Sequence, residues 1–127
     1  MGPHTRDVPL ADVLDLLLTA RAGVLSFEGA NPRHGHEWEV FADFAVPDDL
    51  VLMPGVIDST TNFVEHPRLV TQRIANYAGI VGADRVVAST DCGLATFATG
   101  DAAVGARVAW AKLDSLVGGA AVARRGG

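Results

Sequence analysis

Apolar residues recur along the chain in two ways, as short continuous runs and as longer stretches with helical spacing. The first stretch, PLADVLDLLLTARA (9–22), has apolar residues three or four positions apart, which predicts an amphipathic helix. Asp7 stands just before Pro9, where it is suited to cap this helix. The predicted buried face consists of Leu10, Val13, Leu14, Leu17 and Leu18.

Three strand–helix units are predicted after this first helix. Continuous apolar and β-branched runs predict strands at 23–28, 50–58 and 85–90, and helical spacing predicts helices at 36–46, 67–81 and 102–117. The inward residues of the first two of these helices are expected to be Trp38, Phe41 and Ala42, and Leu69, Val70, Ile74, Tyr77 and Ala78.

Helix ends are predicted from capping residues. Pro67 suits the first position of the helix at 67–81 because its missing N–H has no partner there. Asp101 is the expected cap of the last helix, and the Gly118–Gly119 pair is expected to end it. Residues 120–127 are then expected to form a frayed tail.

This order of elements predicts an α/β fold. Strands that are apolar throughout indicate a parallel sheet covered on both faces, or surrounded by a ring of helices. Two architectures fit: an open doubly wound sheet, and three βα units of a (β/α)8 barrel, which needs about 250 residues when complete. No glycine-rich phosphate loop is present in the sequence, which argues against a nucleotide-binding sheet.

Composition narrows the class of protein. A length of 127 residues predicts one domain, and 49% hydrophobic with 20% charged residues is ordinary for a globular protein. A net charge of −5 and a pI near 5.1 argue against nucleic-acid binding. No apolar run approaches the roughly 18 to 20 residues of a membrane span, and no secretory signal or cysteine pair is found, so we expect a cytoplasmic protein without membrane contact.

Polar residues collect at the ends of the predicted strands. Glu28 closes the first strand, Asp58 closes the second, and Asp91 with the sole cysteine, Cys92, closes the third. In parallel α/β folds this carboxyl edge is where sites are built. A Glu oxygen and a Cys sulfur suit zinc, which would need two further ligands. The sequence therefore predicts one site at this edge.

Simpler interpretations stay open at each position. Cys92 is also compatible with a small buried apolar residue, Glu28 with an exposed cap or salt-bridge partner, and Asp58 with a turn. His34 and His36 flank one residue, so in an extended loop their side chains point apart and suit capping or a solvated loop. His66 is expected to start the helix at 67–81, and Cys92 as a nucleophile with a histidine base has no local signature.

Three segments together resemble one family. FEGANPRHGHEW (27–38), GVIDSTTNFVEHPRLV (55–70) and STDCGLATF (89–97) are similar, in this order, to the C-terminal catalytic barrel of the cobalamin-independent methionine synthases. The likeness is closer to the shorter single-barrel relatives, which also resemble epoxyalkane:coenzyme M transferases, and it extends over nearly the whole chain.

The resemblance implies a zinc-dependent transfer of a methyl or other alkyl group to a thiol on a (β/α)8 barrel. In the methionine synthases the thiol is homocysteine and the donor is a methylated folate polyglutamate. The family holds zinc with a His-x-Cys pair, a Glu and a Cys in a DCG turn; Glu28 and Cys92 match the last two. Asp58 is then expected at the rim of the site as a substrate-orienting carboxylate, and Asp91 as a turn or supporting residue.

The sequence departs from the family at two points. The His-x-Cys pair of the relatives lies upstream of the segment that matches residues 2–5, and Thr60 stands where the synthases have a histidine. We therefore expect residues 1–127 to be the C-terminal three βα units of an incomplete barrel, and leave open whether the chain is itself an enzyme. The alternatives are an inactive or complementing fragment that pairs with another barrel half, a homo-oligomer, and an independent small α/β binding module.

Overall fold

The computed structural model describes residues 8–20, 22–94 and 106–126. The elements follow in the order η1 (Leu10–Asp12), α1 (Leu14–Leu18), β1 (Val24–Phe27), η2 (Glu37–Asp43), β2 (Val51–Ile57), α2 (Pro67–Val81), η3 (Ala83–Arg85), β3 (Ser89–Thr90) and α3 (Ala106–Gly126), where η denotes a 3-10 helix. The predicted α/β class is confirmed. The predicted caps Asp7 and Asp101 lie outside the described residues.

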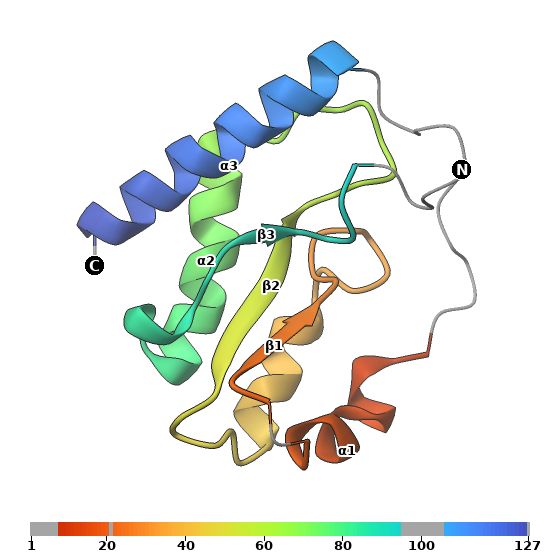
Figure 1. Cartoon of the computed structure of the whole chain (residues 1–127), viewed down its shortest axis with the longest axis vertical. Helices are drawn as coiled ribbons and strands as arrows, with labels where there is room; N and C mark the ends of the chain where they lie inside the picture. The colour runs from red at the N-terminus through yellow and green to blue at the C-terminus, as the bar shows by residue number, and fades with distance from the viewer. Residues whose placement is uncertain (1–7, 21, 95–105, 127) are drawn as a thin grey trace.

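The three strands form one parallel sheet in the order β1-β2-β3 (Figure 1). Val24 is paired with Val51 and Phe27 with Pro54, and the register between β2 and β3 is irregular between Gly55 and Ile57. Strands that neighbour one another in sequence thus neighbour one another in space. Their carboxyl ends lie at one edge.

Helices cover one face of the described sheet. Leu52 and Val56 of β2 are buried against η2, α2 and α3, whereas Val24 and Ser26 of β1 point the other way and are exposed. Met53 of β2 is only half-buried. The expected helices on both faces, as in a doubly wound sheet, are therefore not found in the described part of the chain.

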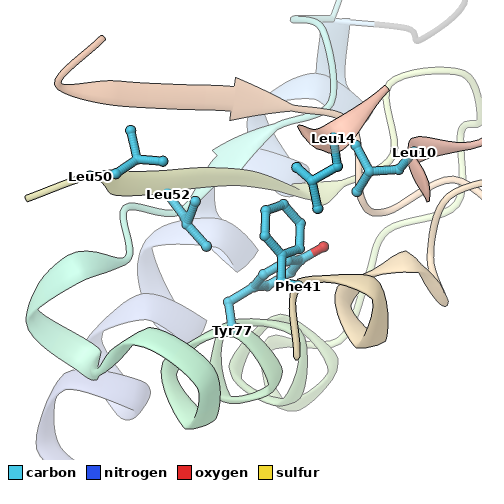
Figure 2. Packing of buried hydrophobic residues seen from close by; sticks show 6 residues of the cluster. All are labelled: Leu10, Leu14, Phe41, Leu50, Leu52 and Tyr77. Carbon is cyan, nitrogen blue, oxygen red and sulfur yellow. The ribbon is translucent and has the colours of Figure 1, made fainter. Parts of the chain in front are cut away.

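Two apolar clusters fill the space between sheet and helices. Figure 2 shows the first, in which Leu52 points from β2 toward Phe41 and Tyr77. The rings of Phe27, Phe41 and Tyr77 meet with centroids 5.0 to 5.8 Å apart, an arrangement that aromatic side chains favour. The second cluster consists of Val56, Ile57, Val70 and Ile74, with Leu116, Ala120 and Ala123 of α3 packed against it.

The helix predicted at 67–81 is confirmed from end to end. Pro67 occupies its first turn, and the imidazole Nδ1 of His66 accepts a hydrogen bond from the Arg68 N–H at 3.0 Å. Val70, Ile74 and Tyr77 are buried, as helical spacing requires. His66 is therefore the residue that starts this helix.

The glycine pair does not end the last helix, contrary to prediction. α3 continues through Gly118 and Gly119 to Gly126, so residues 120–126 are helical rather than a frayed tail. A Cβ on Gly119 would lie 2.5 Å from Val70 Cβ and 2.7 Å from the Pro67 carbonyl oxygen. The missing side chain lets α3 approach α2 closely, and Thr71 Oγ1 donates to the Gly119 carbonyl at 2.8 Å.

The first predicted helix is shorter and broken. Val13, with φ −125° and ψ −10°, separates the 3-10 turn η1 from the five-residue α1. Leu10 and Leu14 are buried as predicted, but Leu17 is 37% exposed.

The helix predicted at 36–46 is a 3-10 helix over a shorter range. With three residues per turn, Trp38, Phe41 and Phe44 align on the inner side, and Ala42 is left exposed. The prediction that Ala42 faces inward is therefore wrong.

The third strand is shorter than predicted. Val86 makes an isolated bridge to Leu52, and regular pairing resumes only at Ser89–Thr90. Arg85, expected in the strand, ends η3 instead, and its guanidinium donates to the carbonyl oxygens of Leu50, Val81 and Pro47. None of the helices in the described ranges combines the length and apolar character that crossing a bilayer requires.

Candidate functional site

The three strand ends meet at one edge of the sheet. Glu28 follows β1, Asp58 follows β2, and Asp91 with Cys92 follows β3. Parallel pairing in the order β1-β2-β3 places these residues side by side at the carboxyl edge. The structure thus brings the predicted residues to the same region of the molecule.

Asp91 lies at the centre of this edge. It is 7% exposed, and its carboxylate accepts hydrogen bonds at 2.9 Å from the backbone N–H groups of Gly29, Ala30 and Asn31. A fourth bond comes from the Asn31 side-chain amide, also at 2.9 Å. Burial raises the pKa of Asp91 above its usual range; these N–H donors oppose that shift, and the Glu28 charge adds to it.

Glu28 lies beside Asp91 and is partly exposed. Its carboxylate is 3.4 Å from the same Asn31 amide nitrogen and 3.6 Å from His34 Nε2. The other ring nitrogen of His34 contacts Glu37, whose second oxygen accepts from the Leu10 N–H at 2.5 Å. The imidazole therefore lies between two carboxylates, and a salt bridge of Glu28 to this ring stays a prediction that requires the protonated imidazole.

The two loop histidines differ. The His34 side chain is 12% exposed, so a solvated position is wrong for it, and a capping role stays a prediction. His36 is exposed and makes no side-chain cap bond to η2, which agrees with a solvated position.

Cys92 is exposed at the end of β3. Its sulfur lies 3.0 Å from the hydroxyl oxygen of Ser59, which follows β2. Gly93 has φ +80°, a conformation that favours glycine, and its N–H donates to Thr90 Oγ1 at 3.0 Å. This tight turn presents the thiol to solvent, which excludes the interpretation of Cys92 as a buried apolar residue.

The Asp58 carboxylate shapes the turn that follows β2. It accepts from the Thr60 N–H at 3.0 Å and from the Thr60 hydroxyl at 2.8 Å, and Thr61 Oγ1 lies 3.4 Å away. The turn expected as the simpler alternative is therefore present. A role in orienting substrate stays a prediction.

A buried ion pair contacts the backbone of Asp58 at the end of β2. Glu65 and Lys112 are fully buried and joined by a contact of 2.8 Å between Oε1 and Nζ. Lys112 also donates to the Asp58 carbonyl at 2.9 Å, and the Asp58 N–H donates to Glu65 Oε2 at 2.6 Å. Both polar backbone groups of Asp58 are thus fixed by charged side chains.

The side chains at this edge include zinc ligands of the usual types, but too few of them to complete a zinc site. Glu28 and Cys92 offer a carboxylate oxygen and a sulfur, both usual zinc ligands, whereas a tetrahedral shell needs four donors. Within residues 8–20, 22–94 and 106–126, no three or more His, Cys, Asp or Glu side chains gather in a way that could hold a metal ion. A zinc ion here would need ligands from elsewhere.

Sequence reasoning missed several residues of this region. Lys112 carries a recoverable signal, because it lies four positions before Leu116 and thus on the buried side of α3. Glu65 follows the apolar pair Phe63–Val64 without any local pattern. The contacts of Asp91 join residues that are about 60 positions apart in sequence and that only folding brings together.

Comparison with known proteins adds a likeness in structure. No protein-family model matches the chain, and no curated protein matches it. Among solved structures, a B12-independent methionine synthase from Shewanella sp. W3-18-1, in complex with selenomethionine, is similar with a TM-score of 0.70 and 22% identity. The match covers 91% of this chain and 30% of that chain, so the present chain spans less than a third of its length. The likeness shows a shared arrangement of strands and helices.

Proposed function

We propose that the chain forms three βα units of a methionine synthase-like (β/α)8 barrel, and that Glu28 and Cys92 supply two ligands to a zinc ion that activates a thiol for alkylation. The observation behind this proposal is the placement of a carboxylate and an exposed thiol at the carboxyl edge of a sheet similar to that of a methionine synthase. One-sided helix cover also suits a barrel, where helices form the outer ring.

The proposed reaction is alkyl transfer to a thiol such as homocysteine, from a donor such as a methylated folate. Zinc, when bound, lowers the pKa of a coordinated thiol, so that a thiolate exists at neutral pH. The thiol proton is lost to solvent as the thiolate forms. A sulfur electron pair would then form a bond to the alkyl carbon as the bond from that carbon to the donor breaks, and the donor would leave with the electrons of that bond and take up a proton from solvent. In this scheme Asp58 orients the substrate from the rim.

Zinc binding is the first test. We expect the purified chain, incubated with zinc and freed of excess metal, to retain zinc, and to retain more when homocysteine is present, because the added thiol supplies a further ligand. Cys92→Ser and Glu28→Gln should each lower the zinc content measured by elemental analysis.

The matched control is Glu39→Gln, which removes an exposed carboxylate of η2 away from the strand ends. Its zinc content should equal that of the unchanged chain. Zinc retention that is equal in all four proteins would contradict the assignment of Glu28 and Cys92.

A second candidate is a fragment that acts only by association with another chain. The specific observation in its favour is the sheet face of Val24 and Ser26, which has no helix over it in the described residues. Such a face is ordinarily filled in a barrel by layers of side chains from the other strands. A partner that completes the barrel would supply these side chains and the further zinc ligands.

A further inference from the structure

The carboxylate of Asp91 connects the segment that follows Glu28 with the segment that contains Cys92. Asp91 directly precedes Cys92, and the three N–H groups that it accepts belong to Gly29, Ala30 and Asn31, which directly follow Glu28. Three consecutive backbone donors and one side-chain amide converge on two oxygens. Hydrogen bonds to an ionised acceptor are about twice as strong as neutral ones.

The surrounding backbone is shaped to admit this carboxylate. A Cβ on Gly55 of β2 would lie 2.0 Å from Asp91 Oδ1 and 2.7 Å from Asp91 Cα. A Cβ on Gly29 would lie 2.9 Å from the Gly55 carbonyl oxygen. Since real side chains do not tolerate such distances, glycine at both positions lets the ends of β1, β2 and β3 pack backbone against backbone around Asp91.

The Asp91 carboxylate also orients Glu28, through the side-chain amide of Asn31. The Asn31 amide nitrogen is 2.9 Å from Asp91 Oδ2 and 3.4 Å from Glu28 Oε2, so one amide lies between the two carboxylates. On the other side of Asp91, the Cys92 sulfur is held by Ser59. The loop after β1 and the turn after β3 therefore share Asp91 as their common attachment.

We propose that Asp91 is a positioning residue that sets the separation between Glu28 and Cys92, with Gly55 providing the space in which its carboxylate sits. The inference rests on the proposed function for its purpose, the joint binding of one metal ion. The positioning itself is a property of the protein alone and is measured without metal.

Cross-linking between positions 28 and 92 tests the proposal. In Glu28→Cys the chain has two thiols, because Cys92 is the sole native cysteine. Dibromobimane becomes fluorescent when both its bromomethyl groups react with thiols, so fluorescence reports residues 28 and 92 held close together. We expect the cross-link in Glu28→Cys, and formation about tenfold slower when Asp91→Ala is added, the equivalent of one lost charge-assisted hydrogen bond.

Two further variants separate positioning from general stability. Asp91→Asn keeps one oxygen acceptor and replaces the other by a donor, so it should restore part of the cross-linking rate. Asp84→Asn makes the same change in an exposed carboxylate of η3, which precedes β3, and it should leave the rate unchanged. Circular dichroism checks that each variant is folded. If Asp91→Ala does not fold, the cross-linking rate of Asp91→Asn is compared with that of the parent variant instead.

Equal cross-linking rates with and without the Asp91 carboxylate would overturn the proposal, as would the absence of any cross-link in Glu28→Cys. Zinc titration gives the second readout. Glu28→Gln should weaken zinc binding in the parent chain and have a smaller further effect in Asp91→Asn, because Glu28 is then less well aligned with Cys92. If the parent chain binds no zinc, the proposed function fails while the cross-linking result still judges the positioning role.

Discussion

Tyr77 shows at the scale of one residue how the core and the candidate site are connected. Its ring is buried between Phe27 and Phe41, while its hydroxyl lies where a side chain on Gly29 would collide with it. Burial raises the pKa of Tyr77 well above its usual 10.0; the charges of Asp91 and Glu37 add to the shift, and Arg73 opposes it. The phenol is thus held in its neutral form by the folded protein.

This shift predicts a loss of stability at alkaline pH. The pKa of Tyr77 is higher in the folded protein than in the unfolded chain. Its contribution to the free energy of unfolding is therefore complete below pH 10 and falls by about 1.4 kcal/mol for each pH unit above it. Tyr77 is the only tyrosine, so absorbance at 295 nm reports its ionisation alone. We expect ionisation to coincide with the loss of circular dichroism.

The matched variant is Tyr77→Phe, which keeps the ring packing and removes the ionisable group. It should shift alkaline unfolding to higher pH, since every other ionisable group is the same in both proteins. Tyrosinate formation near pH 10 without any change in circular dichroism would contradict the burial of this hydroxyl.

Candidate residues at strand ends were predictable, but their partners were not. Glu28, Asp58 and Cys92 follow apolar runs, and the carboxyl edge of a parallel sheet is a general location for sites. The contacts that define the edge join residues far apart in sequence, such as Asp91 with Gly29 and Ser59 with Cys92. No local spacing encodes such pairs, because they depend on the register of the folded sheet.

At the scale of elements, capping residues and apolar spacing predicted the ends of a helix correctly where tertiary packing favoured the same ends. α2 begins at Pro67 and ends before Gly82, whose φ of 95° favours glycine, so propensity, caps and burial agree. In α3 the local signal of Gly118–Gly119 is overridden, because the glycines serve close contact with α2. The length of η2 and its three-residue period were likewise set by packing.

The adjacent glycines of α3 should respond in opposite directions to the same substitution. Gly118→Ala meets only ordinary contacts, the nearest atom being Pro67 Cβ at 3.9 Å, and should stabilise the protein by about 0.5–1 kcal/mol through helix propensity. Gly119→Ala should destabilise it by about 1–3 kcal/mol, because its Cβ collides with Val70. Urea unfolding followed by circular dichroism measures both. A stabilising Gly119→Ala would refute close packing of α3 on α2.

At the scale of the whole molecule, the described sheet is covered on one side only. The helix side buries two apolar clusters, whereas Val24, Ser26 and Met53 on the opposite side retain contact with solvent. Exposed apolar sheet surface favours association, because burial of that surface against another chain releases water. If the chain is part of a barrel, the uncovered face is the surface that we expect a partner to bury, whether that partner is another barrel half or a second copy of this chain.

A second copy of this chain is the partner that a simple measurement detects. We expect the mass in solution, from light scattering and sedimentation, to rise with protein concentration. Val24→Glu places a charge on the uncovered face, where Val24 is 45% exposed, and should weaken self-association about tenfold or more, since the charge must lose water on contact. Leu16→Glu, at a position of α1 that is 71% exposed, is the control and should leave the mass unchanged. If the chain stays monomeric at every concentration, or both substitutions act alike, the uncovered sheet face is not the surface through which copies associate.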